Sequence, residues 1–501
     1  MKKTLFNSFV IGAFITGAAY GQTNFKIGEP ASKGLIKRQD AFVPNPALQR
    51  TISLDSGYLS AFNSNRAIGE FDLELRQAWG GLYDWAYNKW QPTTVFGRTI
   101  LYGLFNAATW GPGLAQMATY HELGHSSRYR SIGIDTSFIN VGKAVLNMYE
   151  KGADNIRIED VLSDGYFPTM FGVTAISALI PFAPMFSAVM FRPDKERLFI
   201  PKNERDYYYP HKLNRFGELL KGEFSDKKYD SKKDKDTVEL VKDIDEIFRP
   251  GTALLTDAGG LNNQVDQCRR VENNLWYQGG DHFSTVGTYF WDKTWAGFQS
   301  LSSQDKGYTD NQDTSLICIA YRRMEIDLTH EEIISYSYLS YILSSQTYAN
   351  IYQIYNTIVY GDNKVYAPEF YNIKLPNFGL YFTTEGPTYN VSSGYRVNDT
   401  LFIPVSVEFG LKKSAWELSV GVRKKFPSFH DSFIHAEVVF NVNNSNLGGS
   451  VYGGLVWDKL WSVRGGFTYH NAKTFQGERN IPSYKNGDTD IEAWLSLGVV
   501  Y

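Results

Sequence analysis

Residues 433–442 read FIHAEVVFNV, and the alternation in this stretch decides the fold of the C-terminal part of the chain. Ile434, Ala436 and Val438 are apolar, whereas His435 and Glu437 between them are polar. Successive side chains of a β-strand point to opposite faces of a sheet. A period of two therefore predicts a strand with one apolar and one polar face.

The same alternation recurs in eight runs along the last quarter of the chain. The runs begin near residues 377, 388, 401, 415, 433, 447, 461 and 490. Each is about ten residues long, which is the length of a transmembrane β-strand. A soluble β-sandwich, whose strands also alternate, is the competing interpretation. We expect residues 370–501 to form an eight-stranded antiparallel β-barrel, with side chains filling its interior.

A second informative stretch is His-Glu-Leu-Gly-His at residues 121–125. Apolar residues upstream follow helical spacing, and Gly111-Pro112-Gly113 predicts a break before the helix starts. On a helix, His121 and His125 share one face and can bind one metal ion, with Glu122 beside them. The competing interpretation is a helix with partly buried histidines and a surface ion pair at Glu122.

The pentapeptide resembles the zinc-binding helix of the zincin metallopeptidases, and it is similar to membrane-associated members of that superfamily. The resemblance covers one helix. It implies one Zn²⁺ ion held by His121 and His125, with Glu122 as the general base of peptide hydrolysis. The metzincin extension is absent, because Arg128 and Ser131 stand where a glycine and a third histidine are needed.

The third metal ligand has two candidates. Asp257-Ala258-Gly259-Gly260 is similar to the aspartate followed by glycines of site-two-type intramembrane proteases. Other zincins use a glutamate on a following helix, and Glu159 matches that alternative. Neither segment carries a full family signature. We expect Asp257 to complete the site.

The N-terminus predicts export. Lys2 and Lys3 precede an apolar stretch, so residues 1–21 are expected to be a signal peptide. The aromatic Tyr501 after alternating apolar positions resembles the C-terminal signal of outer-membrane barrels. Residues 22–365 read mainly helical, with a charged loop at 221–246. The expected fold is therefore α+β, with a helical zincin-like domain before the barrel, in the outer membrane of a Gram-negative bacterium.

Charge and composition limit the partners. The net charge of −3 and the lack of a basic run interleaved with aromatic residues give no reason to expect nucleic acid. The chain has two cysteines, Cys268 and Cys318. This number excludes a framework of several disulfides but leaves open a single disulfide between them. The expected partners are outer-membrane lipid and a protein or peptide substrate in the cell envelope.

Two other functions stay open. A non-enzymatic outer-membrane protein would use its helical domain to bind a partner. An inner-membrane intramembrane protease would use apolar helices, for which the uncharged stretch 165–191 is long enough, although Pro181 and Pro184 interrupt it.

Overall fold

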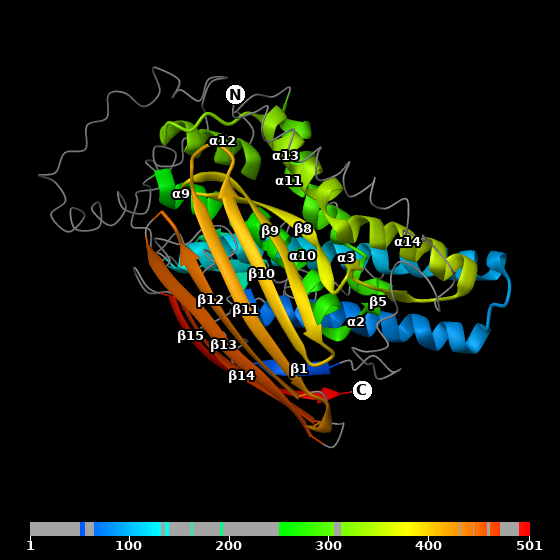
Figure 1. Ribbon diagram of the computed structural model, residues 1–501. Coiled ribbons are helices and arrows are strands. Elements are labelled where there is room, and N and C mark those ends of the chain that lie inside the picture. Colours follow the sequence, from blue (N-terminus) through cyan, green and yellow to red (C-terminus); the bar gives the residue numbers. More distant parts are fainter. Residues whose placement is uncertain are drawn as a thin grey trace, which may run out of the picture.

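The structure is a computed structural model that describes residues 51–55, 65–131, 136–139, 162–163, 191–193, 250–304, 312–429, 432–443, 445–457, 461–470 and 490–500. The predicted signal peptide, the charged loop 221–246 and Glu159 lie outside these residues. Most of the uncharged stretch 165–191 also lies outside them. Within the described part, the chain has the expected α+β composition (Figure 1).

Eight α-helices are described: α2 (Asn65–Trp90), α3 (Val95–Ser131), α9 (Pro250–Asp257), α10 (Gly259–Gln278), α11 (Tyr289–Ser303), α12 (Asp313–Arg323), α13 (His330–Leu343) and α14 (Ser345–Tyr360). Local chemistry sets several of their ends. Thr329 and Glu332 form a capping box at the start of α13. Gly279 and Gly361 end α10 and α14 with φ of 75°, a left-handed conformation that glycine adopts without steric cost.

Helix α3 differs from the expectation at one point. The predicted break at Gly111-Pro112-Gly113 does not occur, since α3 continues through Pro112 from Val95 to Ser131. A proline in a helix removes one backbone hydrogen bond, and tertiary packing can outweigh that loss. Ala115 and Met117, just after the proline, are buried. The metal-binding motif therefore lies in the last third of a long helix and not near the start of a short one.

The eight alternating runs all form strands of one large sheet. They are β8 (Ile373–Thr383), β9 (Gly386–Asn398), β10 (Leu401–Gly410), β11 (Trp416–Phe426), β12 (Ser432–Asn441), β13 (Asn446–Trp457), β14 (Trp461–His470) and β15 (Asp490–Val500). Each pairs antiparallel with the next. Two further strands extend the sheet to ten, with β7 (Glu369–Phe370) beside β8 and β1 (Thr51–Asp55) beside β15.

The expectation of a closed eight-stranded barrel is wrong for the described residues. The sheet order runs from β1 to β7, and these two outer strands do not pair with each other. The interior of a closed eight-stranded barrel has room only for side chains. Here whole helices lie against the inner face of the sheet (Figure 1). The Arg423 guanidinium of β11 stacks 4.1 Å from the ring centre of Tyr277 in α10, and Arg66 of α2 stacks 3.9 Å from that of Trp494.

The large sheet has an inverted polarity. Its inner face carries many buried polar residues, including Glu417, Ser419, His435, Ser462 and Ser496, beside apolar ones such as Leu380, Phe382 and Phe402. The residues on its outer face are apolar and exposed, including Leu418, Val420, Val422, Ile434, Val438, Phe440, Val451, Leu455, Val463, Phe467, Leu495, Leu497 and Val499. A water-soluble sheet normally buries its apolar face. In this sheet the alternation predicted from the sequence is present, but the buried face is the polar one.

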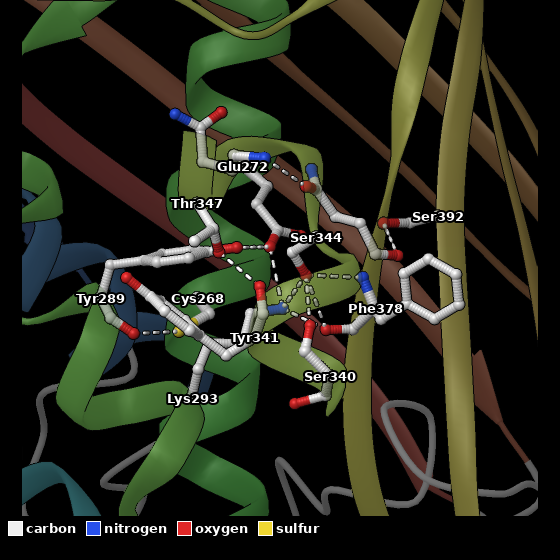
Figure 2. Close-up of polar contacts among 12 residues, drawn as sticks. Cys268, Glu272, Tyr289, Lys293, Ser340, Tyr341, Ser344, Thr347, Phe378 and Ser392 are labelled. Carbon is white, nitrogen blue, oxygen red and sulfur yellow. Dashed lines mark hydrogen bonds and ion pairs between the residues drawn. The ribbon is translucent and has the colours of Figure 1, made fainter. Parts of the chain in front are cut away.

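Polar side chains also bind the helices to the sheet. Lys293 of α11, Glu272 of α10 and Tyr289 are drawn in Figure 2. The ion pair of Lys293 and Glu272 measures 3.0 Å, and Glu272 accepts a 2.6 Å hydrogen bond from the Tyr289 hydroxyl. At the junction of α13 and α14, Ser344 Oγ accepts a 2.9 Å hydrogen bond from the backbone N–H of Phe378 in β8. Helices and strands also share two hydrophobic clusters, one with Phe402 of β10 and one with Leu380 and Phe382 of β8.

The remaining strands form two small sheets. One contains β2 (Thr136–Ile139), β3 (Leu162–Ser163) and β4 (Phe191–Pro193), and the other pairs β5 (Asp281–His282) with β6 (Lys364–Val365).

In the described part of the chain, no helix combines the length and apolar character needed to cross a membrane.

Candidate metal centre

The centre is built on the C-terminal third of α3. His121 and His125 are one helical turn apart and lie on the same buried face. Their ring centres are 4.9 Å apart. The sequence prediction that the pentapeptide lies on a helix is therefore confirmed.

A close helix contact covers the two histidines. A side chain on Gly124 of α3 would collide with the backbone of Gly259, the first residue of α10. At Gly260, a Cβ would lie 2.5 Å from His125 Nε2. The two glycines after Asp257 therefore let the start of α10 approach the motif helix, and Gly260 leaves the space beside both imidazoles free.

Asp313 brings a carboxylate to the histidines. It is the first residue of α12, and its Oδ2 lies 2.9 Å from His121 Nε2. Its Oδ1 lies 3.5 Å from His125 Nε2, and the two Nε2 atoms are 3.1 Å apart. Among the described residues, these three side chains are the group whose ligand atoms lie close enough to share a metal ion.

The predicted third ligands have other positions. Asp257 is the last residue of α9, is half-buried, and does not belong to that group. Glu159 lies outside the described residues. Among the described residues, the carboxylate grouped with the two histidines is therefore that of Asp313 and not that of Asp257.

The spacing of the three ligand atoms fits a zinc ion. Zinc sites are commonly tetrahedral, with ligand distances of about 2.0–2.2 Å, so two ligand atoms on one ion lie about 3.3 Å apart. The two Nε2 atoms are 3.1 Å apart, and they lie 2.9 and 3.5 Å from different oxygens of the Asp313 carboxylate, which are separations near that value. Two imidazole nitrogens and one carboxylate are also ligands that zinc prefers.

Neighbouring groups orient each ligand. His121 Nδ1 lies 3.1 Å from Gln264 Oε1, and His125 Nδ1 lies 2.7 Å from the carbonyl oxygen of Thr256. A nitrogen facing a carbonyl oxygen donates its proton, so in each neutral imidazole the lone pair lies on Nε2, the atom that can bind a metal. Gln299 donates a 3.1 Å hydrogen bond to Asp313 Oδ2. All three side chains are thus held before any metal binds.

Charge in the metal-free site is balanced by a proton. Burial would lower the pKa of His125, but the nearby Asp313 carboxylate raises it to about 10. Burial would likewise raise the pKa of Asp313, but the two histidines hold it well below its usual range. The metal-free centre at neutral pH therefore pairs an ionised carboxylate with a protonated imidazole, and a metal ion would replace that proton.

Glu122 lies beside this centre. It is half-buried, and its charge contributes to the raised pKa of His125. A carboxylate in this position can accept a proton from a water molecule near the three ligands.

The structure also shows where the other candidate histidines and the two cysteines lie. His330 is the first residue of α13, behind the Thr329 cap. His282 caps a short 3₁₀ helix, where its Nδ1 accepts a hydrogen bond from the N–H of Ser284. Cys268 and Cys318 are both buried and not joined, which decides the pairing that the sequence left open.

Comparison with known proteins gives no relative. No family model matches the chain, and neither a curated protein nor a solved structure is similar to it. The interpretation of the centre therefore depends on its own geometry.

Proposed function

We propose that this protein is a zinc-dependent peptidase of the bacterial cell envelope. The observation that supports the proposal most strongly is the cluster of His121, His125 and Asp313, whose nitrogen and carboxylate oxygen atoms lie close enough to share one metal ion. Two histidines with a carboxylate, leaving a fourth position for water, form the ligand set of several catalytic zinc sites. The resemblance of residues 121–125 to the zincin motif points to the same chemistry.

The residues of the chain have separate roles in this proposal. A bound zinc ion supplies Lewis acidity, which lowers the pKa of water to about 7 and polarises a substrate carbonyl. The Glu122 carboxylate accepts the proton of the attacking water and returns it to the departing amine nitrogen. Gln264, Thr256 and Gln299 hold the three ligands in place.

The inverted polarity of the sheet supports the envelope location. Its outer face carries many exposed apolar side chains, whereas its inner face carries buried polar ones and packs against helices. A surface of this kind is typical of strands that face lipid. We propose the outer membrane as the location, with protein or peptide substrates in the envelope.

A variant of the general base tests the activity. Glu122→Gln removes the proton acceptor but no ligand, so we expect it to keep its zinc and lose hydrolysis of unfolded polypeptide by at least about a hundredfold. Glu331→Gln on the exposed first turn of α13 is the matched control and should retain full activity. Equal activity of the two variants would refute the proposed mechanism.

A metal site without turnover is the second candidate function. The burial of both histidines favours it, because structural zinc sites are closed. This alternative predicts zinc in the wild-type protein, no hydrolysis by it, and a large loss of folding stability when the metal is removed.

A further inference from the structure

A second apolar surface lies on α13 and α14, outside the metal centre. No charged residue occurs between Glu332 and Asp362, which includes all of α14. On α14, Ile351, Ile354 and Tyr355 are exposed, by 57, 41 and 50% respectively. On α13, the exposed apolar residues are Leu339 and Ile342.

The buried face of α14 is polar. Gln346, Gln353, Asn356 and Thr357 are all buried. A surface helix of a water-soluble protein has the opposite arrangement, with its apolar stripe toward the core. The helix therefore shows the same inversion as the large sheet.

Gln346, Gln353 and Thr357 of this buried face form hydrogen bonds within the protein. The N–H of Gln346 donates a 2.9 Å hydrogen bond to Asn377 Oδ1 of β8, and Gln346 Nε2 donates one to Asn350. Thr357 Oγ1 accepts from Gln353 and donates to the carbonyl oxygen of Asp362 at 2.8 Å. Partnered polar groups inside, with apolar groups outside, are the arrangement that a hydrocarbon environment requires.

The helix pair also lies where the sheet ends. Ser345 Oγ at the start of α14 donates a 3.0 Å hydrogen bond to the carbonyl oxygen of Leu375 in β8. Ser344, just before it, bonds to Phe378 of the same strand. In Figure 1, α13 and α14 lie near β8, and among the described strands β8 has only the two-residue β7 on the side away from β9.

We infer that α13 and α14 contact the hydrocarbon of the membrane and extend the lipid-facing surface of the sheet beyond β8. The inference rests on the proposed membrane location, but not on the proposed peptidase activity. A 16-residue helix is about 24 Å long, close to the apolar band of about 25 Å on outer-membrane proteins. Tyr348 and Tyr360, near the two ends of α14, are exposed, and tyrosine is enriched at membrane interfaces.

Spin labels test this inference on the full chain in phosphatidylcholine vesicles. A nitroxide is attached at Ile351→Cys on α14, at Val438→Cys on the outer face of the sheet, and at Lys413→Cys in the exposed β10–β11 turn. The native Cys268 and Cys318 are 1 and 2% exposed, so they do not compete for the label in the folded protein. Collision rates are then measured with oxygen, which concentrates in lipid, and with a water-soluble nickel complex.

We expect labels at positions 351 and 438 to collide several times more often with oxygen than with nickel, and the label at position 413 to show the reverse. Nickel accessibility at 351, with lipid exposure at 438, would overturn the inference and leave the membrane location intact. Low collision rates with both reagents at 351 would overturn it as well, since another part of the protein would then cover α14. Nickel accessibility at both 351 and 438 would reject the membrane location itself.

Discussion

Gly260 controls the space that a metal ion would occupy. A Cβ at this position would lie 2.5 Å from His125 Nε2, and it would also collide with His121. We expect Gly260→Ala to lower the bound zinc to well below one ion per chain, as measured by elemental analysis. Gly103→Ala is the matched control, because a Cβ there has no neighbour within 4 Å. Full zinc occupancy in Gly260→Ala would show that the ion does not lie between these histidines.

Gln264 orients His121 through a single side-chain contact. Loss of such a partner typically weakens metal affinity 10- to 100-fold. We predict that weakening for Gln264→Leu in a competition titration with a chelator. The control is Gln346→Leu, which removes another buried amide far from the site in sequence. Equal zinc affinities in the two variants would show that Gln264 does not hold His121 as a metal ligand.

The proton on His125 makes zinc binding depend on pH. Its pKa is raised to about 10, above its ordinary value of 6.5, so the metal-free protein holds this proton throughout the neutral range. Zinc must displace it, and the apparent affinity should therefore rise about tenfold for each pH unit between pH 7 and 9. The affinity would stop rising above about pH 10. A flat profile between pH 7 and 9 would contradict the ion pair with Asp313.

The sequence identifies the two histidines but not the carboxylate beside them. His121 and His125 are four residues apart, so helical geometry alone places them together. Asp313 follows His125 by 188 residues, and as the first residue of a helix it looks like an ordinary first-turn acid. The sequence does contain one local sign of the site, the glycine pair Gly259 and Gly260. They mark a close approach of two helices and not the neighbourhood of a ligand at Asp257.

At the scale of elements, the contact between α10 and α11 depends on a buried ion pair. Lys293 and Glu272 are 3.0 Å apart, and both side chains are 2% exposed. Lys293→Met leaves the Glu272 carboxylate buried without its cation, which typically costs about 3–5 kcal/mol. We predict a loss of that size in the free energy of unfolding, measured by urea titration.

A double variant provides the control for this prediction. Lys293→Met with Glu272→Gln removes both charges, and the amide can still accept the hydrogen bond from Tyr289. Most of the lost stability should return. A double variant as unstable as the single one would mean that packing, and not charge, explains the loss.

The strands were predictable from the sequence and their closure was not. A period of two is a local signal, and all eight predicted runs form strands. Whether a sheet closes depends on what lies against its inner face, and here that includes α10, a helix with a mainly polar sequence. The added strand β1 pairs with β15 across almost the whole chain, between Thr51 and Val500. No local pattern contains that information.

At the scale of the whole molecule, buried polar side chains accompany the hydrophobic clusters inside, and an apolar surface faces outward. Buried ion pairs such as Arg76 with Asp72, 2.8 Å apart, lie inside, whereas large apolar side chains cover the outer face of the sheet. We predict that Val438→Lys destabilises the protein in lipid vesicles by about 2–4 kcal/mol, the cost of a cation on a lipid-facing strand. Val438→Leu should cost less than about 1 kcal/mol. A cost below about 0.5 kcal/mol for the lysine variant would indicate that this face meets water.

The most direct test of the account is the zinc content of three purified proteins after dialysis against metal-free buffer: the wild type, Asp313→Ala and Asp257→Ala. We expect about one zinc ion per chain in the wild type and in Asp257→Ala, and almost none in Asp313→Ala. Zinc retained in Asp313→Ala but lost from Asp257→Ala would contradict the proposed centre. A folded wild-type protein that binds no added zinc would contradict the metal site altogether.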